Sequence, residues 1–228
     1  MSIAENLRKI TDNISRVSLE CGRNPDNIQL VAVSKHFPVT AIEEAILAGQ
    51  KVFGENYLQE AETKTAAIES RASFHFIGHL QRNKAKTAAR IFDVIQTVDS
   101  LRLAETLSKH LVDLHRTIKI LLQVNIGDDD NKSGTSATQT EQLLKDVGAL
   151  PNLEVIGLMT MPPFTEDPEL ARPYFRQMRT LAEELQLKGL FREGHRVELS
   201  MGMSHDYPVA IQEGATIIRV GTAIFGQR

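Results

Sequence analysis

The sequence has 228 residues, of which 42% are hydrophobic and 24% are charged, with a formal net charge of -3 at pH 7. This composition is typical of a globular protein with a substantial buried core. The lack of a basic excess argues against nucleic acid or anionic lipid as a partner. The first residues lack a signal-peptide pattern and no stretch is long and apolar enough for a transmembrane helix, so we expect a cytoplasmic protein.

Hydrophobic residues recur at steps of three and four from residue 3 to residue 21, which predicts an amphipathic helix that Gly22 and Pro25 end. Cys21 is the only cysteine, which excludes an intramolecular disulfide and a cysteine-based metal cluster. Because Cys21 continues the apolar stripe, we expect it to be a packed structural thiol. The next apolar run, residues 28–34, predicts a strand that is buried on both faces.

Predicted helices and strands alternate along the rest of the chain. Further strands are expected at residues 52–54, 74–77, 94–98, 118–125, 153–159, 197–200 and 216–220, and helices at 40–47, 57–70, 82–90, 101–114, 139–150, 168–187 and 206–214. This order predicts an α/β fold, a single-domain (β/α)8 TIM barrel over residues 1–228 whose extra N-terminal helix takes the eighth helix position. A doubly wound open sheet is the alternative, but no Gly-x-Gly-x-x-Gly motif follows the first strand.

Lys35 follows the first buried strand directly. An ammonium group at the end of a buried strand is difficult to solvate, which lowers its pKa and favours the neutral, nucleophilic amine. That is the chemistry of a lysine that forms Schiff bases. An arbitrary strand-terminal lysine more often extends into water, so the assignment depends on the other end of the chain.

Two stretches near the end of the chain predict a phosphate site. Residues 199–204 follow the seventh strand and open a helix, so hydroxyls, a glycine and backbone N–H groups meet at a positive helix end. Residues 219–223 follow the eighth strand with an arginine, a glycine and a threonine. The loops after strands seven and eight of a barrel commonly bind phosphate, and ring closure places Lys35 beside them. An amine next to a bound phosphate describes pyridoxal 5'-phosphate (PLP) held as an internal aldimine.

Several motifs resemble those of the pyridoxal phosphate homeostasis protein family, whose members are single-domain barrels similar to the amino-terminal domain of alanine racemase. These motifs are Val33-Ser34-Lys35, Gly54-Glu55-Asn56-Tyr57, His75-Phe76-Ile77-Gly78 with Leu80-Gln81 and Asn83-Lys84, Leu199-Ser200-Met201-Gly202-Met203-Ser204 with Asp206, and residues 219–226. The resemblance implies that Lys35 carries the cofactor. It further implies contacts from Ser200, Gly202, Gly221 and Thr222 to the phosphate, from Arg219 to the ring nitrogen or phosphate edge, and from Asn56, His75 and Met159 elsewhere around the ring.

Some of these assignments have simpler alternatives. Asn56 is also explained as a helix cap, Met159 as core, and His75 as a core imidazole with satisfied hydrogen bonds. His36 and Pro208 are unusual at their positions, which leaves the local loop geometry open.

The same residues favour a carrier over an enzyme. An arginine at the pyridine nitrogen leaves it unprotonated and makes the ring a poor electron sink. Alanine racemases also use a tyrosine from another domain, and we expect no such domain in a chain that ends at Arg228. We therefore predict a monomer that holds PLP, hands it to PLP-dependent apoenzymes, and acts in vitamin B6 and amino-acid homeostasis without strong turnover. A weak PLP-dependent amino-acid racemase or related enzyme is the alternative.

Two charged segments favour ordinary surface roles. Four cations, Arg82, Lys84, Lys86 and Arg90, fit a solvated helix face and lack the aromatic platform of a nucleic-acid site. The run Asp128-Asp129-Asp130 is typical of a solvated acidic turn, and no histidines accompany it as metal ligands.

Overall fold

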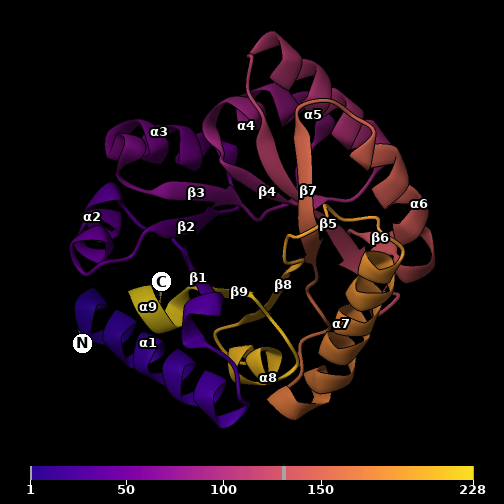
Figure 1. The fold of residues 1–228 in the computed structure, drawn as a ribbon. Coiled ribbons are helices and arrows are strands. Elements are labelled where there is room, and N and C mark those ends of the chain that lie inside the picture. The colour runs from indigo at the N-terminus through magenta and orange to yellow at the C-terminus, as the bar shows by residue number, and fades with distance from the viewer. Residues whose placement is uncertain (1, 130–131, 228) are drawn as a thin grey trace.

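A closed ring of parallel strands forms the centre of the computed structural model, which describes residues 2–129 and 132–227 (Figure 1). In ring order the strands are β1 (Gln29–Val33), β2 (Val52–Glu55), β3 (Ser73–Phe76), β4 (Val94–Val98), β5 (Ile118–Asn125), β7 (Leu153–Met159), β8 (Glu198–Met203) and β9 (Ile217–Val220). The ring closes because β9 pairs with β1, with Val31 opposite Arg219 and Ala32 opposite Val220. The predicted barrel is confirmed, and the two ends of the chain meet in neighbouring strands.

Helices surround the ring on its outer side (Figure 1). They are α1 (Ile3–Glu20), α2 (Val39–Leu47), α3 (Leu58–Ile68), α4 (Ala85–Ile91), α5 (Leu101–Asp113), α6 (Ala137–Gly148), α7 (Arg172–Leu187), α8 (Tyr207–Gln212) and α9 (Thr222–Phe225). Helix α1 contacts α2, α8 and α9, so it occupies the outer position that an eighth barrel helix would otherwise take. No helix in the described part of the chain combines the length and apolarity needed to cross a lipid bilayer.

The sequence of α1 explains both of its ends. Ser2 and Glu5 form a capping box, in which each side chain accepts a hydrogen bond from the backbone N–H of the other residue. The apolar stripe then faces the barrel through residues such as Ile10 and Val17, which are buried. Cys21 is exposed, however, and the expectation of a packed thiol is wrong. It is the C-cap of the helix, where the backbone leaves the helical path and the stripe no longer continues.

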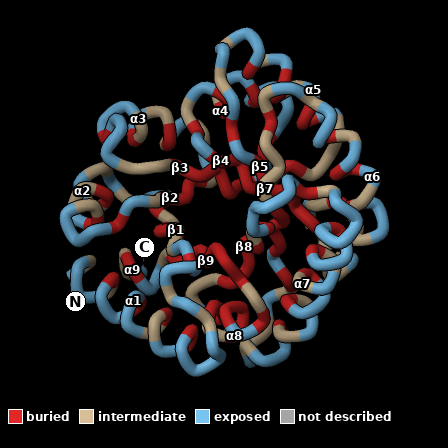
Figure 2. The backbone as a smooth tube through the Cα atoms, in the orientation of Figure 1, coloured by how far each residue is buried: buried red, intermediate tan, exposed pale blue. Residues whose placement is uncertain are grey.

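Side chains pack in two hydrophobic layers. The larger layer lies between the strands and the helices, and a smaller cluster of Val31, Val94, Leu121, Met159 and Ile217 fills the interior of the ring. Figure 2 shows the resulting pattern, with buried backbone along the ring and exposed backbone on the outer loops and helix surfaces. Because side chains alternate along a strand, Val31 points into the ring and Ala32 toward the helices.

A few elements differ from the sequence-based expectation. The short strand β6 (Thr135–Ser136) beside β5, and helix α9, fall in segments expected to be loops. Strand β8 continues three residues beyond residue 200, through Gly202, whose φ of 91° is in the left-handed region. Short 3-10 turns, η3 (Arg82–Lys84) and η4 (Pro168–Ala171), form the first residues of two predicted helices.

Candidate functional site

A cavity of about 300 Å3 lies at the carboxyl ends of the strands, the end of a barrel where ligands bind. Five of the predicted site residues line it: Lys35, Asn56, Arg219, Gly221 and Thr222. Lys35 follows β1 and Arg219 belongs to β9, so the pairing of these strands brings an amine from residue 35 and a guanidinium from residue 219 to one cavity.

The backbone on both sides of Lys35 is tied to helix α3. The Lys64 ammonium donates to the Ser34 carbonyl at 2.8 Å, and the His36 N–H donates to Glu60 Oε2 at 2.8 Å. His36 has a φ of 67°, an uncommon left-handed conformation for a residue with a side chain, and its bond to Glu60 holds it there. Contacts with α3 therefore fix the backbone on both sides of Lys35.

Glu55 and Lys64 form a buried ion pair that contacts Ser34, the residue before Lys35. Glu55 Oε1 accepts from Lys64 Nζ at 2.8 Å and from Ser34 Oγ at 2.6 Å, and Lys64 also contacts Glu60 at 3.1 Å. The Glu55 side chain is 0% exposed and that of Lys64 is 6% exposed. Burial raises the pKa of Glu55, while the hydrogen bonds from Lys64 and Ser34 limit the rise. Pairing through Oε1 offsets part of the cost of burying the two charges, while Glu55 Oε2 is buried without a hydrogen-bond partner among the described residues.

The loop after β8 supplies the second side of the cavity. Ser204 lines the cavity, and its Oγ accepts from the Gly221 N–H at 3.2 Å, which joins the loops after β8 and β9. Asp206 Oδ1 accepts from the Met203 N–H at 2.6 Å and closes the turn. A Cβ at Gly202 would lie 2.6 Å from the Ala210 Cβ, so only glycine lets α8 pack this closely on the strand end.

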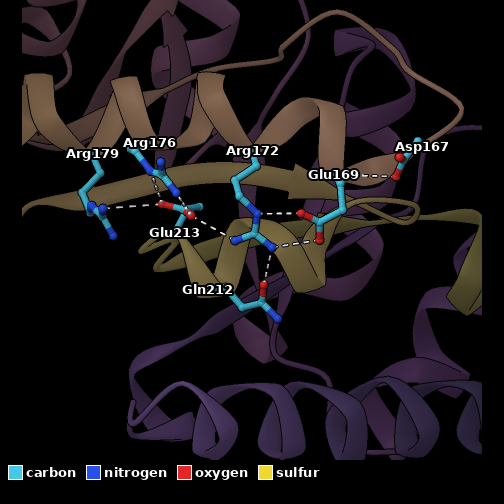
Figure 3. A network of polar contacts seen from close by, with 7 residues as sticks. All are labelled: Asp167, Glu169, Arg172, Arg176, Arg179, Gln212 and Glu213. Carbon is cyan, nitrogen blue, oxygen red and sulfur yellow. Dashed lines mark hydrogen bonds and ion pairs between the residues drawn. The ribbon is translucent and has the colours of Figure 1, made fainter.

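Helix α8 is itself anchored at its far end by a network of arginines (Figure 3). Glu213, which follows α8 and is buried, contacts Arg172 at 2.9 Å, Arg176 at 3.1 Å and Arg179 at 3.5 Å, all from α7. Burial favours the neutral form of the Glu213 carboxyl, but hydrogen bonds from Arg176 and Arg172 outweigh it and lower its pKa. The network fixes the helix whose first turn follows the Ser204 loop.

Arg219 is a buried charge at the cavity. Its guanidinium is buried, and it donates to Ser200 Oγ at 2.6 Å and to the Thr160 carbonyl at 2.8 Å. Burial lowers the pKa of Arg219 to about 10, and the Asp206 carboxylate opposes this change. The group therefore keeps its positive charge at pH 7.

Four predicted site residues are not among those that line the cavity in the described part of the chain. Ser200 lies beneath it, against Arg219, and Met159 is part of the cluster inside the ring. Gly202 does not line the cavity, but its lack of a side chain lets α8 pack closely on the end of β8. His75 is buried and its Nδ1 lies 2.8 Å from Gln96 Nε2. Burial lowers the pKa of His75 to about 4, so its ring is neutral at pH 7.

Other lining residues were not predicted from the sequence. Ser204 lines the cavity and belongs to the predicted phosphate motif of residues 199–204, in which the resemblance implies Ser200 and Gly202 as the phosphate contacts. Met161 and Phe164 come from the loop after β7, and Met203 comes from the end of β8. The signal for the loop was the Pro162-Pro163 pair, which breaks the chain at the edge of the cavity.

The lining has the chemistry that PLP requires. Lys35 and Arg219 supply two cations against one carboxylate, that of Asp206, so the cavity favours an anion. Ser204 and Thr222 supply hydroxyls, and Val33 and Ile77 are among the apolar walls that suit an aromatic ring. Asn56 Oδ1 is buried without a hydrogen-bond partner among the described residues, as expected of a group that forms a hydrogen bond with a ligand. These residues fit the cofactor.

The described residues of the two charged segments do not line the cavity. Arg82, Lys84, Lys86 and Arg90 are exposed, and Arg90 pairs with Glu62 at 2.6 Å. Among the described residues no group of three histidines, cysteines, aspartates or glutamates could hold a metal ion. Asp130, the last residue of the acidic run, lies outside the described residues.

Comparison with known proteins gives a consistent set of relatives. Residues 6–228 match the model of the family described as alanine racemase, N-terminal domain. The pyridoxal phosphate homeostasis protein of Aquifex aeolicus (strain VF5) is 39% identical over 229 residues, which cover 100% of this chain and 99% of that protein.

Two solved structures of PipY from Synechococcus elongatus PCC7942 share the fold. The structure without PLP has a TM-score of 0.86 at 41% identity, and it covers 99% of this chain and 100% of that chain. The structure with PLP bound has a TM-score of 0.84 at 39% identity, with the same coverage. The barrel, the cavity at the carboxyl ends of its strands and these full-length similarities together show that the chain belongs to the pyridoxal phosphate homeostasis protein family.

Proposed function

We propose that the protein binds PLP as a Schiff base on Lys35 and hands it on to PLP-dependent apoenzymes, acting in vitamin B6 and amino-acid homeostasis without strong catalytic turnover. The observation that carries this proposal is the meeting of Lys35 and Arg219 at one cavity, together with the hydroxyls of Ser204 and Thr222. The PLP-bound structure of PipY, a relative with 39% identity, supports the choice of ligand.

Each lining residue then has a role that follows from its chemistry. Lys35 supplies the amine that joins the cofactor aldehyde. Ser204, Thr222 and the backbone at Gly221 bind the phosphate. Arg219 donates to the ring nitrogen or the phosphate edge. The buried amide of Asn56 forms a hydrogen bond with a substituent of the ring.

The predicted residues beneath the cavity act through others. Ser200 holds Arg219, and Gly202 shapes the loop that carries Ser204. Met159 and His75 are buried in the interior of the barrel and support the cofactor site from there, without lining the cavity in the described part of the chain.

Two features support a carrier rather than an enzyme. When bound, PLP supplies an electron sink, but an arginine at its ring nitrogen leaves that nitrogen unprotonated and weakens the sink. None of the three tyrosines, Tyr57, Tyr174 and Tyr207, lines the cavity in the described part of the chain, where a second acid or base would have to act.

Binding is tested by titrating the protein with PLP and recording the visible absorption of the bound form. The wild type should give a Schiff-base band that free amines discharge, and Lys35→Ala should give none. Lys51→Ala is the matched control, because Lys51 precedes β2 and is exposed at the amino-terminal end of the ring. Equal bands from the wild type and Lys35→Ala would overturn the assignment.

The weak-racemase alternative is tested separately. The PLP-loaded protein is incubated with L-alanine and L-serine, and the D-isomers are measured by chiral chromatography. We expect the cofactor to exchange from Lys35 to the free amino acids with little inversion. Rapid inversion would favour the enzyme.

We further propose that the protein is a cytoplasmic monomer and that residues 1–228 form one PLP-binding domain. The exposed, free thiol of Cys21 fits a reducing compartment. The family match over residues 6–228 supports a single domain. Light scattering after size-exclusion chromatography measures the oligomeric state, and a dimer mass would contradict the monomer.

A further inference from the structure

A chain of four buried side chains crosses the interior of the barrel beneath the cavity. Arg219 on β9 donates to Ser200 Oγ on β8 at 2.6 Å, and Ser200 Oγ lies 2.6 Å from Gln96 Oε1 on β4. Gln96 Nε2 lies 2.8 Å from His75 Nδ1 on β3. Ser200 and Gln96 are 0% exposed, and Arg219 and His75 are each 3% exposed. The chain therefore runs from the guanidinium at the cavity to an imidazole in the ring interior.

With the Gln96 amide oriented as it is in the structure, these hydrogen bonds run in one direction. A guanidinium can only donate, so Ser200 Oγ accepts from Arg219 and must place its own hydrogen on another acceptor. That acceptor is Gln96 Oε1, which fixes the orientation of the amide and turns its Nε2 toward His75. Since the amide nitrogen donates, His75 Nδ1 must be unprotonated, and the ring carries its proton on Nε2.

The arrangement also limits how Arg219 can move. Its guanidinium has five N–H groups, and the bonds to Ser200 and to the Thr160 carbonyl engage two of them on the side away from the cavity. Donation to Gln96 Oε1 turns the Ser200 hydrogen away from the guanidinium and leaves the lone pairs of Oγ to accept from Arg219. Without Gln96, the hydroxyl would compete for the Thr160 carbonyl or lose a buried hydrogen bond.

We propose that Gln96 is a positioning residue for cofactor binding: acting through Ser200, it orients the Arg219 guanidinium toward the cavity and holds His75 in the Nε2–H tautomer. The part that concerns the cofactor rests on the proposed function. The part that concerns the tautomer depends only on the protein and can be measured without PLP.

The tautomer is measured first, by 15N NMR of histidine-labelled, PLP-free wild-type protein. The His75 signals are assigned by their loss in His75→Gln. We expect Nδ1 to resonate as an unprotonated acceptor and Nε2 as an N–H nitrogen at pH 7. A protonated Nδ1 would overturn the direction of the chain.

The effect on Arg219 is measured by PLP affinity and by the absorption of the bound cofactor in Gln96→Leu. Loss of the amide should weaken PLP binding about five- to tenfold, the cost of one hydrogen bond in a buried network, and should alter the cofactor band. It should also release the His75 tautomer, which a purely space-filling role for Gln96 would not do. Wild-type affinity, band and His75 signals in Gln96→Leu would refute the proposal.

Gln123→Leu is the matched control. Gln123 is a buried glutamine on β5 whose amide donates to the Ser133 carbonyl at 2.9 Å and lies outside the four-residue chain. It should leave PLP affinity and the His75 signals unchanged. If Gln96→Leu does not fold, Ser200→Ala gives the second measurement: it cuts the chain one residue nearer to Arg219 and should weaken PLP binding to a similar extent, and unchanged binding would refute the proposal.

These outcomes distinguish failure of the proposed PLP binding from failure of the positioning role of Gln96. If the wild type forms no adduct with PLP, the proposed function fails while the tautomer result still decides the direction of the chain. If the wild type binds PLP and Gln96→Leu binds it equally well, the proposed function stands and the positioning role of Gln96 fails.

Discussion

Replacing Lys64 by methionine tests whether the buried ion pair of Glu55 and Lys64 stabilises the barrel. The substitution keeps the length and apolar stem of the side chain but removes the ammonium that contacts Glu55, Glu60 and the Ser34 carbonyl. Glu55 then remains 0% exposed without its cation. Removing one partner of a buried pair costs about 3–5 kcal/mol. At about 2–4 °C per kcal/mol for a chain of this size, we expect Tm to fall by about 6–20 °C.

The assays are thermal unfolding, which gives Tm, and urea unfolding, which gives the free energy of unfolding. Both are followed by circular dichroism, with Lys145→Met as the matched control. Lys145 makes a similar contact, 2.7 Å to Glu141, but its side chain is 47% exposed. An exposed pair contributes at most about 1 kcal/mol, so the control should unfold nearly like the wild type. The double variant Lys64→Met with Glu55→Gln should recover part of the loss, because no unpaired charge remains.

The same variant has a defined pH dependence. The pKa of Glu55 is raised by burial, and Lys64 limits the rise; without Lys64 it must rise further. A carboxyl with a raised folded-state pKa contributes stability at low pH that is lost as the pH rises through that pKa. The cost of Lys64→Met should therefore shrink from about pH 8 to about pH 5. An equal cost for Lys64→Met and Lys145→Met, or a cost that grows at lower pH, would refute the reasoning.

Three further predictions concern the cavity and the network beneath it. Arg219→Gln should weaken PLP retention about ten- to hundredfold through loss of a charge-assisted contact, and unchanged retention in equilibrium dialysis would show that Arg219 does not reach the cofactor. Gly202→Ala should lower the free energy of unfolding by about 1–3 kcal/mol, because its φ is 91° and its Cβ would meet Ala210; full stability in urea would contradict this. The wild type should lose stability as the pH falls from about 6.5 to about 4, since burial lowers the pKa of His75, and His75→Gln should lose less over that range. Parallel pH profiles for the two proteins would exclude His75 as the cause.

The barrel could be predicted because apolar runs and turn residues marked its strands. Strands β5 and β7 begin and end at the expected residues, where uninterrupted apolar runs meet polar loops. The sequence predicts the end of β8 at residue 200 and the opening of a helix after it, whereas Gly202, in a left-handed conformation, forms an irregularity within a strand that continues to Met203. Helix α9 has four residues, too few for a helical period to show in the sequence.

The site was harder to predict than the fold because depth in the barrel is not visible in the sequence. Met159 and Ser200 face each other in the register of β7 and β8, and both lie beneath the cavity. Two residues after Met159 and four after Ser200, Met161 and Ser204 line the cavity. Side-chain alternation gives the face of a strand but not which layer touches a ligand. Gln96 gave no signal, since an isolated glutamine in an apolar strand belongs to no motif.

Reduction of the PLP-loaded protein with borohydride, followed by peptide mapping, tests the central claim most directly. The reduced adduct should be found on Lys35, on the peptide that contains the end of β1, and it should be absent from Lys35→Ala. An adduct on any other lysine of the wild type would show that ring closure does not create the cofactor site described above.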